Sequence, residues 1–145
     1  MVETKCGKFI ITEFNKHENL NPWAPKYRPE DKIPLLFLDG SVITDAFYSE
    51  CCWFLPAIIE NKSPSSIVKP HKHDYDEVLA IIGSNPEDPK NLFGELEIFL
   101  NGEKHNITRS VMIFLPAGLE HGPIRWTRID RPVFHFSCAM TKKQA

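Results

Sequence analysis

The architecture of this chain is most directly inferred from Pro70-His71-Lys72-His73-Asp74-Tyr75-Asp76-Glu77, in which two histidines stand two residues apart and a carboxylate follows four residues after the second. Side chains two residues apart on a β-strand point to the same face, so His71 and His73 can face one way together. A tight turn over residues 74–76 can then return Glu77 beside them. The segment therefore predicts three side chains that converge on one point.

A second segment, Leu115-Pro116-Ala117-Gly118-Leu119-Glu120-His121, ends on another histidine. Its proline and glycine favour a turn that delivers His121 at the start of the next strand. A single histidine is more often a surface or hydrogen-bonded residue than a metal ligand. Taken together, however, the two segments predict a metal site formed by His71, His73, Glu77 and His121.

Short β-rich runs separated by turn residues occupy most of the chain, and 12 prolines among 145 residues deny long helices. The best local signal lies at residues 95–108, where an alternating run precedes Asn101-Gly102, a pair that suits the type I′ turn of a hairpin. The predicted strands are residues 8–14, 35–38, 46–55, 67–73, 77–82, 95–100, 103–108, 111–115 and 133–139. This rhythm predicts an all-β sandwich, jelly roll or barrel.

Two segments interrupt the rhythm of strands. In residues 15–34, four prolines alternate with Trp23 and Tyr27, which predicts an extended arm whose aromatic side chains pack on the barrel or on a second subunit. Residues 84–94 predict a loop that either borders a cavity mouth or forms passive surface.

The composition is that of a soluble globular protein with one domain, because 42% of the residues are hydrophobic and 25% are charged. A formal net charge of −2 gives no general attraction to nucleic acid or to an anionic membrane. No apolar run approaches the ~20 residues of a membrane helix, and the amino terminus lacks the pattern of a secretory signal. We therefore expect a cytoplasmic protein whose four cysteines are reduced.

The pattern HxHxxxE followed by PxGxxH resembles the two conserved motifs of the cupin family, whose members are double-stranded β-helix barrels of the jelly-roll type. The resemblance rests on residues 71–83 and 116–121, while Ser110 and Arg125 stand where the family usually has glycine and asparagine. It implies a single cupin barrel over residues 35–145, preceded by an N-terminal strand and proline-rich arm over residues 1–34.

The donor set narrows the choice of metal. Three neutral imidazoles and one carboxylate are too rich in nitrogen for calcium or magnesium and offer no sulfur to copper(I), which leaves iron, manganese, nickel, cobalt or zinc as a divalent ion. A six-coordinate ion with four protein ligands keeps two positions for dioxygen, water or a chelating substrate. The side chains predicted to shape a substrate pocket beside it are Tyr75, Phe99, Phe114, Arg125 and His135.

Two of these pocket residues have open interpretations. His135 alternates with Phe134 and Phe136, so only one of the two sets faces the cavity, and His135 is either a proton carrier or a residue of the other face. Arg125 is either a clamp for a substrate carboxylate or an exposed arginine.

The resemblance implies a metal-binding protein that acts on a small molecule, with an iron(II)-dependent dioxygenase or related oxidoreductase as the first expectation. A metal-dependent isomerase or lyase and a non-catalytic binding or sensing protein stay open, because nothing in residues 71–121 separates them. A homodimer is expected, since the edge strands of a small open barrel and the aromatic arm both need covering.

Overall fold

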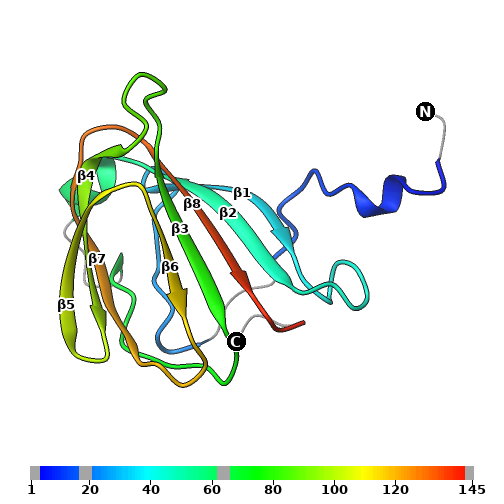
Figure 1. Ribbon diagram of the computed structural model, residues 1–145. Coiled ribbons are helices and arrows are strands. Elements are labelled where there is room, and N and C mark those ends of the chain that lie inside the picture. Colours follow the sequence, from blue (N-terminus) through cyan, green and yellow to red (C-terminus); the bar gives the residue numbers. More distant parts are fainter. Residues whose placement is uncertain (1–3, 17–20, 62–65, 143–145) are drawn as a thin grey trace.

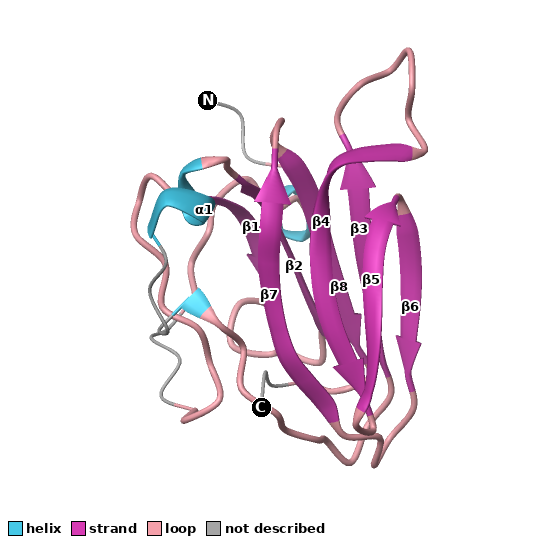
Figure 2. Cartoon of the chain, turned by 90° about the vertical axis from the view of Figure 1, so that its left-hand side faces the viewer, coloured by secondary structure: helices cyan, strands magenta, loops and turns pink. Residues whose placement is uncertain are grey.

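The computed structural model of the protein describes residues 4–16, 21–61 and 66–142, and nearly all of its regular structure is β (Figure 1). The strands are β1 (Lys32–Leu38), β2 (Tyr48–Phe54), β3 (Glu77–Gly83), β4 (Asn91–Leu100), β5 (Glu103–Arg109), β6 (Val111–Leu115), β7 (His121–Ile129) and β8 (Val133–Ala139). One antiparallel sheet has the order β1-β2-β8-β3-β6 and a second has the order β5-β4-β7. The two sheets face each other (Figure 2), which confirms the predicted all-β jelly-roll architecture.

The hairpin predicted at residues 95–108 is confirmed. Its strands are β4 and β5, and the two residues between them, Asn101 and Gly102, have φ angles of 50° and 82°. Positive φ at both central positions is what a type I′ turn requires.

Two predicted strands are wrong, and one helix was not predicted. Residues 8–14 overlap a short 3-10 helix, Gly7–Phe9, after which Ile10 is exposed rather than packed on a sheet. Residues 67–73 take part only in isolated bridges, at Val68 and His71. The unpredicted helix is α1 (Ala57–Asn61). No helix within the described ranges is long and apolar enough to cross a membrane.

The register of the larger sheet aligns a set of side chains across β2, β8 and β3. Because the direction of side chains repeats every two residues along a strand, alternate rows of this sheet face the interior. Two successive interior rows are Glu50, Ser137 and Leu79, followed by Cys52, His135 and Ile81.

The core has two parts, at opposite ends of β2. The larger cluster surrounds Phe54 and Val133, which pair with each other at one end of the sheet. The smaller cluster contains Tyr48 and Ala139, which pair at the other end. The interior row at Glu50 therefore lies between two packed clusters.

The proline-rich arm contacts the barrel within residues 21–31. The Tyr27 ring meets the Phe54 ring edge to face, with 5.5 Å between their centroids, and Trp23 stacks on His71. Both aromatic side chains therefore contact residues outside the arm. The domain boundary predicted after residue 34 falls inside β1, and residues 1–3 and 17–20 of the predicted N-terminal segment lie outside the described residues.

Candidate metal centre

Three imidazoles of the predicted set lie together at one end of the sandwich. One donor nitrogen from each of His71, His73 and His121 lies within 4.8 Å of the other two. His71 and His121 form a two-way backbone bridge, with 2.9 Å between N and O in both directions. The Gly118 N–H donates to the carbonyl of His73 at 2.7 Å, so both predicted segments are fixed to each other through their backbones.

Hydrogen bonds to backbone carbonyls orient two of the three rings. Nδ1 of His71 lies 2.7 Å from the carbonyl oxygen of Lys69, and Nδ1 of His121 lies 3.0 Å from that of Leu119. A carbonyl only accepts, so each Nδ1 carries the proton in the neutral ring and each Nε2 presents a lone pair. A carbonyl that holds Nδ1–H in this way is the usual companion of a metal-binding histidine.

The Nε2 atom of His121 is the strongest indication of a bound cation. His121 is 3% exposed, and its Nε2 is buried without a hydrogen-bond partner in the part of the chain that the structure describes. Buried polar atoms are rarely left unpaired. A divalent ion shared with the other two imidazoles would supply the missing partner, so the residues present fit a transition metal.

Glu77 begins β3 next to this cluster. Its Oε1 lies 3.8 Å from Nε2 of His121, although Glu77 is not part of the group of three whose donors all lie within 4.8 Å of one another. Burial, reinforced by the negative charge of Glu50, raises the pKa of Glu77 to about 7. A nearby cation would favour the ionised carboxylate, so Glu77 is suitably placed to serve as a fourth ligand.

Burial also favours the neutral form of the imidazoles. It lowers the pKa of His71 to about 4, against the effect of the bond to Lys69, and it lowers the pKa values of His73 and His121. Neutral imidazole is the form that binds a metal.

Two aromatic rings support the histidines from outside the predicted ligand set. Trp23 lies parallel to the His71 ring at 3.9 Å between centroids, and its backbone carbonyl accepts a bond from the Lys69 N–H. Tyr75 stacks on His73 at 4.8 Å. The sequence predicted that Trp23 packs on the barrel but carried no signal for its contact with a ligand residue.

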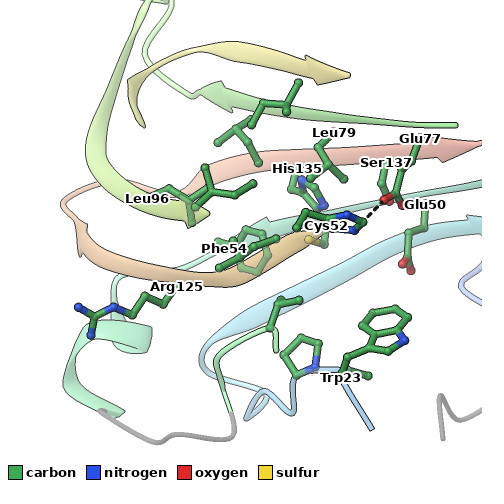
Figure 3. Close-up of a pocket in the computed structure, with 18 of the residues that line it drawn as sticks. Trp23, Glu50, Cys52, Phe54, Glu77, Leu79, Leu96, Arg125, His135 and Ser137 are labelled. Atoms are coloured by element: carbon green, nitrogen blue, oxygen red, sulfur yellow. Dashed lines mark ion pairs between the residues drawn. The ribbon is translucent and has the colours of Figure 1, made fainter. Parts of the chain in front are cut away.

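A cavity of about 190 Å³ extends from the histidines between the two sheets (Figure 3). Its apolar wall comprises Leu79, Ile81, Leu96, Ile98, Ile113 and Ile124. Its polar wall comprises Lys16, Lys32, Tyr48, Glu50, His135 and Ser137.

A buried network of charged and polar groups crosses the polar wall. Lys16 Nζ lies 3.1 and 3.2 Å from the two carboxylate oxygens of Glu50, and the two side chains are only 16% and 14% exposed. The Tyr48 hydroxyl bonds to Glu50 and lies 3.0 Å from the hydroxyl of Ser137. Sequence reasoning missed this network, although the alternation of Tyr48, Glu50 and Cys52 places all three on one face of a strand.

Three of the five predicted pocket residues do not line the cavity. Phe114 is 59% exposed on the outer face of β6, because its neighbour Ile113 takes the inward position. Phe99 lies outside the lining in the same way, because Ile98 is the inward residue of β4. Tyr75 lies behind His73 and packs against the smaller core cluster.

The other two, Arg125 and His135, line the cavity. The guanidinium of Arg125 donates to Glu97 at 2.8 Å, and in Figure 3 it points away from the centre of the cavity. Half of its side chain is exposed, at 52%. His135 instead belongs to the inward set of β8, and its Nδ1–H donates to the carbonyl of Ala80 at 3.1 Å.

Replacing His135 by Asn is expected to make the protein less sensitive to acid. Burial lowers the pKa of His135 to about 4, whereas an unfolded chain binds the proton near 6.5. The folded state therefore loses stability relative to the unfolded state as pH falls from 6.5 towards 4. Between pH 7 and pH 4 the free energy of unfolding should fall by roughly 3 kcal/mol less in His135→Asn than in the wild type. Urea titrations at both pH values measure this difference, and parallel losses would contradict the prediction.

The fold is similar to that of several solved structures. A recombinant oxalate oxidase in complex with glycolate aligns with a TM-score of 0.54 over 95% of this chain and 62% of its own, at 13% identity. A second structure, of oxalate oxidase with the substrate analogue glycolate, aligns with a TM-score of 0.51 over 92% and 62%, at 14% identity. An RmlC-like cupin from Shewanella frigidimarina aligns at 0.45 over 77% of each chain, at 13% identity.

This chain thus spans 62% of the length of the oxalate oxidases that it matches. No protein-family model and no curated protein sequence matches it. The likeness is one of fold, and a shared fold does not determine the chemistry of the site.

Proposed function

We propose that this chain, which has the cupin fold, binds one divalent transition metal through His71, His73, His121 and Glu77 and acts on a small organic molecule in the adjoining cavity. The observation that carries the proposal is the buried, unpartnered Nε2 of His121 beside two further imidazoles, as seen among the described residues. Iron(II), manganese, nickel, cobalt and zinc all accept such a donor set.

An iron(II)-dependent dioxygenase or related oxidoreductase is the reaction class that we propose first. Bound at this site, the metal would polarise a ligand and, if it is iron(II), supply redox chemistry. The chain itself would orient two imidazoles through the Lys69 and Leu119 carbonyls, and its apolar wall would exclude water from the reacting groups.

A metal-dependent isomerase or lyase is the second candidate, and one observation favours it. Glu50, which is half-buried, and Tyr48, which is buried, are both ionisable and hydrogen-bonded to each other, and both line the cavity that Glu77 borders. Isomerisation and elimination both need a group that accepts a proton and returns it. Glu50, held by Lys16 on one side and Tyr48 on the other, is placed to hold such a proton.

Oxygen uptake discriminates these functions. Protein loaded with iron(II) under anaerobic conditions is mixed with phenols, thiols and organic acids, and dissolved oxygen is then admitted and followed. The dioxygenase proposal expects substrate-dependent uptake by the iron(II) form and none by the zinc form or by His73→Ala.

Product formed without oxygen would replace that proposal by the isomerase or lyase. Saturable binding without any product would indicate a binding or sensing protein. If the purified wild type took up none of the five metals, the proposed centre itself would be excluded.

A further inference from the structure

The cavity contains a second lysine, and this one has no carboxylate partner among the residues that the structure describes. Lys32 lines the wall at the start of β1, and within residues 4–16, 21–61 and 66–142 no ion pair involves it. Its Nζ lies 5.3 Å from the centroid of the Tyr27 ring and 6.0 Å from that of Phe54. Two aromatic faces thus hold a charged ammonium group at the cavity wall without neutralising it.

With a divalent metal in place, the charges of the cavity do not balance without a ligand. Lys16 and Glu50 neutralise each other through their close ion pair. A divalent metal held by three neutral imidazoles and the Glu77 carboxylate would carry a net charge of about +1. Lys32 adds a further positive charge, so the cavity is complementary to an anion.

Lys32 and the histidines lie at opposite ends of the cavity. Lys32 pairs with Phe54 at one end of β2, whereas Glu77 pairs with Ala139, which pairs with Tyr48 at the other end. From Tyr48 to Phe54, β2 advances by six residues, which corresponds to about 20 Å between the backbone positions at the two ends. The side chains extend inward from both ends and shorten this distance.

The space between the two ends has an apolar side. Leu79 and Ile81 face it from β3, and Leu96 and Ile98 face it from β4. A hydrocarbon or aromatic body is what such a surface accommodates.

We propose that the ligand of this cavity is an organic anion with an apolar body, whose carboxylate is bound by Lys32 while its opposite end lies towards the three histidines. The position of the reacting end rests on the proposed function, because it assumes the metal. Recognition of the carboxylate by Lys32 does not, because Lys32 is not one of the proposed metal ligands.

The test compares a short acid with its neutral isostere. Hexanoate and hexanamide have nearly the same shape, and only hexanoate carries a charge. Isothermal titration of both compounds into the full chain, first stripped of metal with a chelator and then loaded with zinc, gives the preference for the acid. The wild type should prefer hexanoate at least tenfold, which is the typical contribution of a charge-assisted contact.

Three variants assign that preference to one side chain. Lys32→Met keeps the aliphatic stem and removes the charge, and in the metal-free protein its preference should fall below about twofold. Lys32→Arg keeps the charge and should retain most of the preference. Lys90→Met removes an exposed lysine of the loop before β4 and should behave as the wild type.

Equal affinities of the wild type for acid and amide, or no binding of hexanoate, would overturn the proposal. So would a tenfold preference that persists in metal-free Lys32→Met. If Lys32→Met failed to fold, the comparison of acid with amide on the wild type would still decide. Failure of the metal centre is recognised separately, because it would leave the preference for hexanoate intact while zinc content stays at zero.

Discussion

His73→Ala is expected to lose nearly all of its bound metal while remaining folded. The substitution removes one of three imidazoles whose donors lie within 4.8 Å of one another, and a smaller change, the loss of a residue that orients a ligand, already lowers metal affinity by roughly 10- to 100-fold. We therefore expect affinity to fall by at least about 100-fold. His73 belongs to neither core cluster, so the barrel should keep its structure. Elemental analysis of the purified protein and zinc titration measure the effect.

His105→Ala is the matched control for this experiment. His105 lies on β5, where its Nε2 is 2.9 Å from a carboxylate oxygen of Glu103 and its side chain is 40% exposed. Its removal deletes a histidine without touching the cluster, and metal content should stay at the wild-type level. Equal metal content in the His73 and His105 variants would contradict the proposed ligand set.

Gly122→Ala is expected to affect both stability and metal binding. Gly122 has a φ angle of 105°, and a Cβ atom there would lie 2.9 Å from both the carbonyl oxygen of Lys69 and Cα of Pro70. The positive φ and the crowding each cost about 1–2 kcal/mol, so the free energy of unfolding should fall by roughly 2–4 kcal/mol. The segment that would be displaced leads directly into His71, so zinc affinity should fall as well.

Gly102→Ala is the control that introduces the backbone strain of a positive φ without displacing a neighbouring segment. Gly102 also has a positive φ, 82°, but no atom lies within 4 Å of the added Cβ. Its loss of stability should be limited to about 1–2 kcal/mol, with unchanged zinc affinity. Urea titration and zinc titration of both variants provide the comparison. If Gly122→Ala bound zinc as tightly as Gly102→Ala, the packing of the glycine against Pro70 would not be what positions His71.

Each half of the histidine cluster could be predicted from the sequence because the spacing within it is local. A separation of two residues pairs His71 with His73, and a turn defined by proline and glycine positions His121. That the two segments meet is implied by their resemblance to the two cupin motifs. The facing of the aromatic residues could not be predicted in the same way. Phe99 follows Ile98, and Phe114 follows Ile113, so neighbouring residues of each strand are both apolar. Either neighbour could therefore face the interior, and in the structure the isoleucines line the cavity.

Contacts between segments that are distant in the chain could not be predicted from the sequence either. Lys16 reaches Glu50 across 34 residues, and nothing in either neighbourhood indicates the other. The run at residues 8–14 has the composition of a strand but lacks a partner strand in the described structure, and composition alone cannot supply one.

The homodimer and the cytoplasmic location stay predictions. Exposed apolar side chains on β6, Met112 and Phe114, support the former.

Trp23 and Tyr27 complete the cavity from a segment that precedes the first strand of the barrel. The segments that carry the histidines and the segment that shapes the space around them are therefore separate pieces of the chain. A substitution of Tyr27 can therefore reshape the space open to a ligand without reaching the histidines, because its ring packs on Phe54. A substitution of Trp23 changes both at once, because its ring also stacks on His71.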